Sequence, residues 1–318
     1  MSSNLALIYR AFGAPDAVLS LQTLKAEELA ADRVRVAMTL SPVNASDLIP
    51  ITGAYRHRIT LPAIAGYEGV GTVIQAPAQA AHLLGKRVLP LRGQGTWQRL
   101  VDSPLAFTVP VPDDISDVQA ARAYINPLAA LLMLNLYPPA GKHVLITAAG
   151  SDCATLLGQW ALKRGALSVT GVHRSPVHRQ KLAECGIQPL EETRSAEIEA
   201  LAQTTDIVYD ATGGKLADLL LSSMRKTALF VSYGLLSGQP YRILPHHPST
   251  QWFHIRNALD AVSAPQWQRL FAEIWTLLRQ SRINDASVFP LAHWQEAIAF
   301  YKTSGRTRKP LLAFSAKP

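Results

Sequence analysis

The sequence has few cysteines that could form disulfides and no long apolar run that could span a membrane. It contains two cysteines, Cys153 and Cys185, which exclude a disulfide framework and a four-cysteine zinc lobe. No apolar run reaches the roughly 18 residues that a membrane span needs. The N-terminus, MSSNLALIYRAFG, lacks a basic segment followed by a long apolar stretch. We therefore expect no secretory signal, no membrane segment and a cytoplasmic location.

Charged residues are also scarce, at 17% against 48% hydrophobic residues. This balance excludes a disordered chain, and the 318 residues predict a sizeable core and about two domains. Acids are the scarcer charge, because 31 Lys and Arg outnumber 23 Asp and Glu and give a net charge of +8. A basic balance favours anionic partners such as phosphorylated cofactors or acyl-thioester carriers. No nucleic-acid motif is present, so we expect no nucleic-acid partner.

The first 115 residues have no helical period of useful length and are β-rich. Segments such as "DRVRVAMTLSPV" and "GYEGVGTVIQA" alternate in polarity or are punctuated by glycine, as strands are. A helical pattern then starts at Ser116. Pro127 lies inside this pattern and should break it into two helices, because proline cannot donate to the helix ladder.

From Gly141 the pattern changes to alternating strands and helices. The strand patterns are "KHVLITAA", "SVTGVHR", "TDIVYDATGG" and "ALFVSYGLLSG", and two of the helical patterns between them end at Gly165 and Gly186. Such alternation predicts a parallel sheet with right-handed crossovers. A final strand-like segment, "KPLLAFS", is expected to return to the first domain. The chain is thus interpreted as an α/β protein, with a first domain of residues 1–115 and 256–318 and an inserted doubly wound domain of residues 116–255.

The stretch "TAAGSDCATLLG", residues 147–158, stands between a strand and a helix, where dinucleotide-binding folds place their phosphate turn. Gly150 supplies one of the usual glycines, Ala154 stands where alanine is tolerated, and Ser151 is small. Asp152 is the misfit, since a carboxylate repels a pyrophosphate unless it turns away and caps the helix. On this pattern alone, an α/β domain that merely starts a helix here remains an alternative. The predicted cofactor turn comprises Gly150, Ser151, Asp152, Cys153 and Ala154.

The end of the next strand lacks the acid that holds the ribose hydroxyls of NAD. It carries His173, Arg174 and Ser175 instead, and Arg179 follows one helical turn later. Guanidinium and hydroxyl groups suit a 2′-phosphate through charge-assisted hydrogen bonds. We therefore predict NADPH rather than NADH as cofactor, with ordinary surface arginines at a helix start as the alternative.

Several motifs resemble those of the medium-chain dehydrogenase/reductase superfamily. The segments "SPVNASDLIPITGAYRHRITLPAIAGYEGVGTV", "GTWQRLVDSPLAFTVPVPDDIS", "NPLAALLML" and "TDIVYDATGG" occur in its order and spacing, so that the resemblance covers nearly the whole chain. The chain is most similar to the zinc-free branch that holds quinone oxidoreductases and 2-enoyl thioester reductases. The resemblance implies a GroES-like catalytic domain, a Rossmann-type cofactor domain, and a homodimer formed by edge strands of the cofactor domains.

Two residues depart from the zinc alcohol dehydrogenases of this superfamily. Asn44 stands where those enzymes carry a cysteine, and Tyr67 replaces the histidine of their Gly-His-Glu motif. Amide and phenol groups are poor zinc ligands, so we expect an enzyme without a metal. Without a Lewis acid, the favoured reaction is reduction of an activated double bond in a quinone, an enone or an acyl thioester. Such a site must hold the developing enolate oxygen and deliver one proton.

Tyr55, in "GAYRHR", is the predicted proton donor, because a phenol with an ordinary pKa near 10 is protonated at pH 7. The resemblance implies the same role, and an ordinary loop tyrosine is the alternative. Asn44 is predicted to donate to the substrate or to the nicotinamide ribose. The resemblance and position add further candidates: Asp47 (or a helix cap), Tyr67 and Trp97 (or packing) for the substrate pocket, and Asn126, Tyr233 and Gly234 for the cofactor.

Two classes of function remain open from the sequence. The first is an NADPH-dependent oxidoreductase acting on a small molecule. The second is a non-catalytic member of the same fold that binds or senses NADPH, and the eroded turn at "AGSDCA" is its main support.

Overall fold

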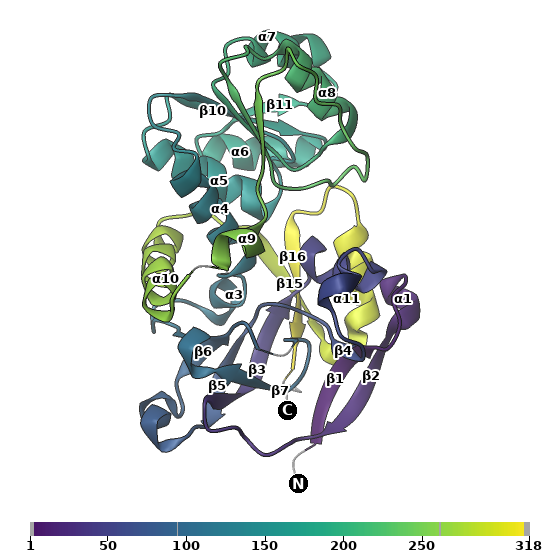
Figure 1. Cartoon of the computed structure of the whole chain (residues 1–318), viewed down its shortest axis with the longest axis vertical. Helices are drawn as coiled ribbons and strands as arrows, with labels where there is room; N and C mark the ends of the chain where they lie inside the picture. The colour runs from purple at the N-terminus through teal and green to yellow at the C-terminus, as the bar shows by residue number, and fades with distance from the viewer. Residues whose placement is uncertain (1–2, 94, 261, 315–318) are drawn as a thin grey trace. The chain divides into compact units, whose positions relative to one another are not determined.

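The computed structural model describes residues 3–93, 95–260 and 262–314, and it divides the chain into two compact units (Figure 1). Unit 1 comprises Met1–Ile125, Ser263–Arg279 and Asn284–Pro318, and unit 2 comprises Asn126–Val262 and Gln280–Ile283. The first boundary therefore follows Ile125, whereas the sequence interpretation placed it after residue 115. The second follows Val262, whereas the interpretation placed it after residue 255.

Unit 1 is built on strands that come from both ends of the chain. They are β1 (Ser3–Tyr9), β2 (Leu19–Lys25), β3 (Arg33–Pro42), β4 (Ala63–Ile64), β5 (Val70–Gln75), β6 (Arg87–Pro90), β7 (Leu100–Pro104), β8 (Thr108–Pro110), β15 (Asp285–Pro290) and β16 (Arg308–Ala313). One sheet has the order β15-β16-β3-β5-β6-β8, with β7 also paired to β3, and a smaller sheet has the order β2-β1-β4. The pairing of β16 with β3 confirms that the C-terminal strand returns to the first domain.

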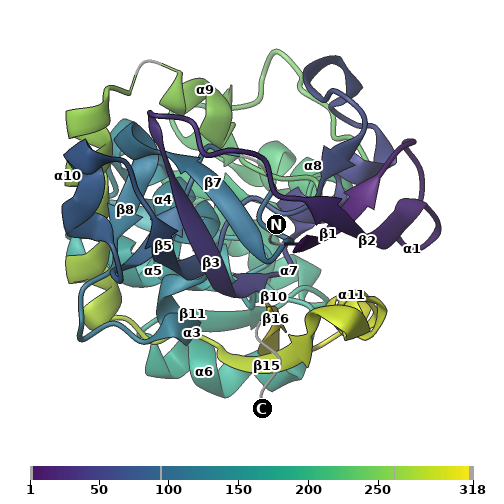
Figure 2. The same cartoon turned by 90° about the horizontal axis from the view of Figure 1, so that it is seen from below.

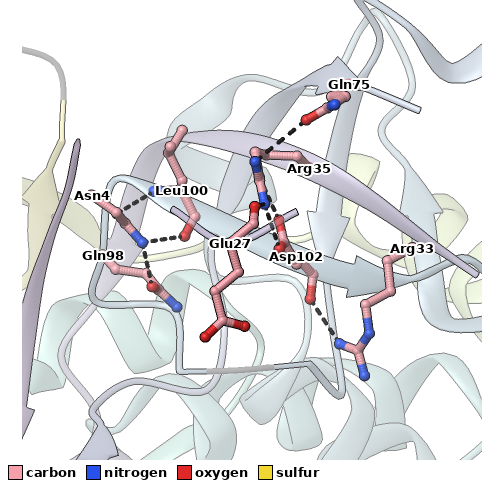
Figure 3. Close-up of polar contacts among 8 residues, drawn as sticks. All are labelled: Asn4, Glu27, Arg33, Arg35, Gln75, Gln98, Leu100 and Asp102. Atoms are coloured by element: carbon pink, nitrogen blue, oxygen red, sulfur yellow. Dashed lines mark hydrogen bonds and ion pairs between the residues drawn. The ribbon is translucent and has the colours of Figure 1, made fainter. Parts of the chain in front are cut away.

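A partly buried ion pair joins β3 to β7. Arg35 faces Asp102 across the two strands. Its Nε and Nη2 donate to the two carboxylate oxygens at 2.7 and 2.8 Å, as Figure 3 shows. Nη2 also donates to the carbonyl of Glu27 at 2.7 Å. A bidentate pair adds direction to charge, so this contact ties the centre of the sheet to the segment before β3.

Short helices and two longer ones complete unit 1. They are α1 (Pro15–Val18), α2 (Ala45–Leu48), α3 (Asp117–Ala120), α10 (Ala264–Arg279) and α11 (Trp294–Lys302). Figure 2 shows α11 alongside β15 and β16. Trp294 and Ile298 of α11 join the same apolar core as Trp97 and Leu312. The face of α10 that is buried follows the helical period, with Trp267, Phe271, Ile274, Trp275 and Leu278 inward.

Unit 2 is a parallel sheet with helices between its strands, which confirms the predicted α/β domain. Its strands, in the spatial order β11-β10-β9-β12-β13-β14, all run parallel to their neighbours. They are β9 (His143–Ile146), β10 (Ser168–His173), β11 (Gln188–Glu191), β12 (Ile207–Asp210), β13 (Leu229–Ser232) and β14 (Ser249–Trp252). The helices are α4 (Ile125–Leu136), α5 (Asp152–Lys163), α6 (Arg179–Glu184), α7 (Ser195–Ala202), α8 (Gly214–Ser223) and α9 (Ile255–Leu259). Side chains of α7 and α8 share one core with Leu145 of β9 and Phe230 of β13.

The helix break predicted at Pro127 lies elsewhere. The pattern does divide in two, but α3 ends at Ala120 and α4 begins at Ile125, so Pro127 stands in the first turn of α4. The first N–H groups of a helix have no partner within it, and proline is tolerated there. The predicted helix ends at Gly165 and Gly186 are confirmed by their φ of 84° and 75°.

Among the helices of the described residues, none combines the length and the apolar character that a bilayer crossing demands.

Candidate functional site

The segment that follows β3 is held by one buried carboxylate. Asp47, 1% exposed, accepts hydrogen bonds from the backbone N–H of Asn44 at 2.8 Å and from that of Tyr67 at 3.0 Å. It thus satisfies a backbone group at the start of α2 and ties it to the strand-connecting segment at residue 67. Asp47 was predicted to face the substrate pocket, with a helix cap as the alternative. Its contacts are those of the cap.

The side chain of Asn44 is buried between two charged groups. Its Nδ2 donates to Oε1 of Glu68 at 2.7 Å, and its Oδ1 accepts from the ammonium of Lys309. Asn44, Glu68 and Lys309 are all at most 5% exposed. An amide held from both ends has a fixed orientation. Sequence reasoning missed Glu68 and Lys309. Glu68 stands next to Tyr67 in the quoted motif, whereas Lys309 lies 265 positions from Asn44 with no local signal to mark it.

Glu68 connects this segment to the end of the first segment of unit 1. Its Oε2 accepts from the backbone N–H of Tyr124 at 3.0 Å and of Ile125 at 2.8 Å. Burial raises the pKa of Glu68, and these donors, together with Lys309 and Asn44, oppose that rise. Burial likewise raises the pKa of Asp47 to about 7, and the nearby charge of Glu68 adds to the effect. Two carboxyl groups are therefore packed close to one ammonium in the interior.

Ser46 adds a hydroxyl to this segment. Its Oγ is buried and has no hydrogen-bond partner within residues 3–93, 95–260 and 262–314. A buried hydroxyl without a partner is rare in folded proteins. No sequence argument had singled out this hydroxyl.

Tyr55 lies in a polar loop, between the 3₁₀ turns Pro50–Thr52 and Arg56–Arg58. Ile51 is buried and anchors the loop, while Tyr55 is half-buried. The next three residues, Arg56, His57 and Arg58, are exposed and basic. The Arg56 guanidinium carbon lies 5.8 Å from the centre of the Phe12 ring, which holds this cation at the loop surface.

Trp97 lies in the core, in agreement with packing, which was the alternative to a place in the substrate pocket. Its side chain is 0% exposed, and its Nε1 donates to the carbonyl of Pro42 at 3.1 Å. Gly66 packs on this ring, because a Cβ at Gly66 would stand 2.3 Å from Cδ1 of Trp97, and its φ is 87°. Trp97 therefore packs against the chain at both Pro42 and Gly66. Tyr67, next to Gly66, is half-buried.

In unit 2 the predicted phosphate turn joins β9 to α5. Ala148 has a φ of 49°, an uncommon conformation for a residue with a side chain, and it turns the chain out of the sheet. Ser151 is the N-cap of α5, with its Oγ accepting from the N–H of Ala154 at 3.3 Å. Asp152 had been offered as that cap, and instead it is the first residue of the helix. There its negative charge lies at the positive end of the helix dipole, which is favourable for the helix.

Gly150 is needed for packing within the protein. A Cβ at this position would stand 2.5 Å from two ring atoms of His178, the residue before α6. The sequence analysis named Gly150 as one of the usual glycines of the cofactor turn. The structure adds that the imidazole of His178 lies directly against the turn, in a segment that the sequence analysis had not included.

The carboxyl ends of β9 and β12 are tied together beside this turn. Thr147 Oγ1 donates to Oδ1 of Asp210 at 2.6 Å and accepts from the N–H of Ala211 at 2.9 Å. The other Asp210 oxygen accepts from the N–H of Gly213 at 2.9 Å. Burial raises the pKa of Asp210, and these hydrogen bonds oppose that effect.

Two buried hydroxyls at the end of β13 lack protein partners. Within the part of the chain that the structure describes, Ser232 Oγ and Tyr233 OH have no hydrogen-bond partner. Burial raises the pKa of Tyr233, with smaller contributions from Cys153 and Asp210, so the phenol keeps its proton. These hydroxyls stand at the carboxyl edge of a parallel sheet, where doubly wound folds bind their ligands. Together with the strand–turn–helix at residues 146–152, they fit a dinucleotide.

The strand end predicted to hold a 2′-phosphate presents two exposed arginines, Arg174 and Arg179. His173 is buried, and its Nδ1–H donates to the carbonyl of Ser175 at 3.0 Å. His173 therefore holds the backbone at the end of β10 through Ser175, and the two arginines place positive charge at the surface beside it. Asn126 and Gly234 are half-buried, in the first turn of α4 and after β13.

Across residues 3–93, 95–260 and 262–314, no three His, Cys, Asp or Glu side chains come together as a metal-binding group.

Comparison with known proteins identifies the family. Residues 30–113 match the model of the alcohol dehydrogenase GroES-like domain. A candidate NADPH:quinone reductase from Bacillus thuringiensis has a crystal structure that is 33% identical over 99% of this chain and 100% of that one, with a TM-score of 0.92. The human mitochondrial enoyl-[acyl-carrier-protein] reductase is 27% identical over 315 residues, or 92% of this chain and 84% of that protein. The mitochondrial 2-enoyl thioester reductase heterodimer of Candida tropicalis, 21% identical over 99% of this chain and 100% of that one, has the same fold, with a TM-score of 0.82. The chain therefore belongs to the medium-chain dehydrogenase/reductase superfamily, in the zinc-free branch of quinone oxidoreductases and 2-enoyl thioester reductases.

Proposed function

We propose that this protein is an NADPH-dependent, zinc-independent reductase of activated double bonds, with Tyr55 as proton donor. The observation that carries the proposal is the likeness over the whole chain to the Bacillus thuringiensis protein, which is named for NADPH and a quinone. The Tyr55 loop and the hydroxyl of Ser46 in unit 1 support it, because reduction of a conjugated carbonyl compound requires hydrogen-bond donors at the oxygen.

The cofactor would be held by residues of unit 2. The turn from Gly150 to Ala154 would receive the pyrophosphate, and Arg174 and Arg179 the 2′-phosphate. Ser232 and Tyr233 would hydrogen-bond to the remainder through their buried hydroxyls. When bound, NADPH supplies a hydride for the β-carbon of the substrate. The chain then has to stabilise negative charge on the carbonyl oxygen and deliver a proton, which is the role that we assign to the phenol of Tyr55.

An enoyl thioester is the substrate class that we favour over a quinone. The exposed bases Arg56, His57 and Arg58 directly follow Tyr55 and would attract an anionic carrier. The human relative is named for an acyl-carrier-protein substrate. A quinone carries no anionic group for these bases to attract. The support for a quinone substrate is the name of the Bacillus thuringiensis protein. A panel of crotonoyl thioester, naphthoquinone and small enones, compared by kcat/KM, separates these classes.

The role of Tyr55 is tested by Tyr55→Phe. Removing the phenol hydroxyl should lower kcat by about 10²-fold or more, the usual contribution of a positioned proton donor, with little change in NADPH affinity. Tyr137→Phe is the matched control, because Tyr137 is another half-buried tyrosine, located after α4. Wild-type kcat in the Tyr55→Phe protein rules out this residue as proton donor.

The cofactor assignment is tested by Arg174→Ala. The variant should bind NADPH about 1–3 kcal/mol more weakly, the value of a hydrogen bond to a charged group. Its affinity for NADH should be nearly unchanged. Arg194→Ala is the control, since Arg194 pairs with Glu197 on the surface of unit 2. Equal weakening of both cofactors argues against a 2′-phosphate contact at Arg174.

The alternative is a non-catalytic protein that binds or senses NADPH, and the acidic residue Asp152 in the turn favours it. Two measurements decide between the classes: fluorescence quenching by NADPH and turnover of the substrate panel. Binding without turnover of any substrate supports the sensor, and absence of binding at saturating NADPH contradicts both.

We also propose a homodimer formed through β14, and a cytoplasmic location. β14 is an edge of the unit 2 sheet, and its Trp252 is 55% exposed. An edge strand with an exposed aromatic residue offers backbone groups and apolar area to a second copy. Sedimentation of the full chain measures the mass directly. Cell fractionation tests the location, which for the human relative is mitochondrial.

A further inference from the structure

A buried chain of three polar side chains runs through unit 1. The ammonium of Lys309 donates to Asn44 Oδ1, and Asn44 Nδ2 donates to Glu68 Oε1 at 2.7 Å. Lys309 belongs to β16, Asn44 immediately precedes α2, and Glu68 precedes β5. An amide between a cation and a carboxylate is polarised in one direction, which strengthens both hydrogen bonds in a medium of low dielectric.

The carboxylate end of this chain holds the backbone where unit 1 ends. Glu68 Oε2 accepts from the N–H groups of Tyr124 and Ile125, and Ile125 is the last residue of the first segment of unit 1. The amide end holds the segment that carries Ser46. One ammonium therefore acts on two stretches of backbone that lie far apart in the sequence.

The charges of this cluster are not balanced one to one. Asp47 and Glu68 are two carboxyl groups. The charges of Glu68 and Lys309 act on Asp47, and the charge of Lys309 acts on Glu68. The donors that face them are the side chain of Asn44 and backbone N–H groups, including that of Tyr67. Burial of an unpaired carboxylate is costly, so the N–H donors and the ammonium of Lys309 together offset that cost.

We propose that Lys309 is a positioning residue, whose ammonium orients the Asn44 amide and, through it, holds the Glu68 carboxylate on the backbone of residues 124 and 125. Lys309 touches neither substrate nor cofactor in this role. Its kinetic consequence rests on the reductase function proposed above, whereas its effect on the buried carboxylates does not depend on that function.

The test compares Lys309→Met, which keeps length and loses charge, with Lys309→Arg, which keeps charge. Lys302→Met is the matched control, because Lys302 forms an exposed pair with Asp16. Thermal unfolding is recorded at pH 5.5 and pH 8 for each full-length variant. Loss of the ammonium matters most where the carboxyl groups are ionised, so Lys309→Met should lower Tm by at least about 3 °C more at pH 8 than at pH 5.5. Lys302→Met should show no such difference.

A second variant decides whether the coupling runs to Glu68. In the Lys309→Met background, Glu68→Gln removes the carboxylate that lost its cation, and it should recover part of the Tm lost at pH 8. In wild type the same substitution should lower Tm. Equal losses for Lys309→Met at both pH values, or additive losses in the double variant, overturn the proposal and leave Lys309 as a packing residue. If Lys309→Met alone does not fold at pH 8, recovery of folding in the double variant with Glu68→Gln supports the coupling, and failure to recover overturns it.

The kinetic arm measures kcat and the NADPH KM. Lys309→Met should lower kcat at least tenfold and change the NADPH KM less than threefold, with partial recovery in Lys309→Arg. An unchanged kcat in an active enzyme contradicts the positioning role. If the wild-type protein reduces none of the substrates, the proposed function fails, and the unfolding data still decide whether Lys309 acts on the carboxyl groups.

Discussion

Replacing Asp47 with Asn should remove a pH dependence from the stability of this protein. Burial and the charge of Glu68 raise the pKa of Asp47 to about 7. A carboxyl whose pKa is higher in the folded than in the unfolded state contributes stability that is complete below its unfolded pKa. That stability is lost as pH rises through the folded pKa. For one group the slope reaches at most about 1.4 kcal/mol per pH unit, so the wild type should lose stability between about pH 4 and pH 7.

The Asp47→Asn variant lacks this titration. Its amide also has one oxygen for the two N–H groups, of Asn44 and Tyr67, that the carboxylate serves. An orphaned buried N–H costs about 1–3 kcal/mol. We therefore expect the variant to be less stable than wild type at pH 5, with a deficit that shrinks as pH rises toward 7 and then levels off.

Urea unfolding followed by the fluorescence of the six tryptophans measures this at pH 5, 6, 7 and 8. Asp114→Asn is the control: its pairing with Arg279 lowers the pKa of Asp114, so that this group stays ionised over the whole range. A wild-type–minus–variant difference that is the same at all four pH values refutes the assignment of this titration to Asp47.

Three further predictions concern stability and are read from urea unfolding at pH 7. Gly150→Ala should destabilise by about 1–3 kcal/mol, because its Cβ would overlap the His178 ring; full stability means that the ring moves aside easily. Arg35→Met should cost about 3 kcal/mol, since it leaves the Asp102 carboxylate, 18% exposed, without its cation, and a loss below about 0.5 kcal/mol contradicts that role. Ser151→Ala should cost about 1 kcal/mol through loss of the α5 cap, and Ser151→Asp should retain the cap.

Unit 2 was predictable because its signals are local. Apolar runs bounded by turn residues indicate buried strands, and the helices end at glycines with positive φ. The break near Pro127 was misplaced for an equally local reason. Proline ends a helix when it lies inside one but is accepted in the first turn, and the sequence does not state where α4 begins.

The residues of the candidate site divide in the same way. Tyr55, Asn44 and the turn at 150–154 could be named from motif and resemblance, and they stay predictions. The contacts around them depend on partners elsewhere in the chain. Trp97 was named for the substrate pocket with packing as the alternative, and its contacts with Gly66 and the carbonyl of Pro42 are those of packing. Gly150 was named for the cofactor turn, and the structure adds that the imidazole of His178 lies against it.

The sequence by itself determined the fold class, the family and the residue types available for chemistry, because hydrophobic period, glycine positions and motif spacing are properties of short segments. Only the tertiary structure decided which charges meet. Hydrogen bonds and burial depend on distance in space, and Lys309 reaches Asn44 only because β16 returns to pair with β3. The same return makes the carboxyl groups of Asp47 and Glu68 neighbours of one ammonium. Burial raises the pKa of both groups, and the charge of Lys309 opposes that rise.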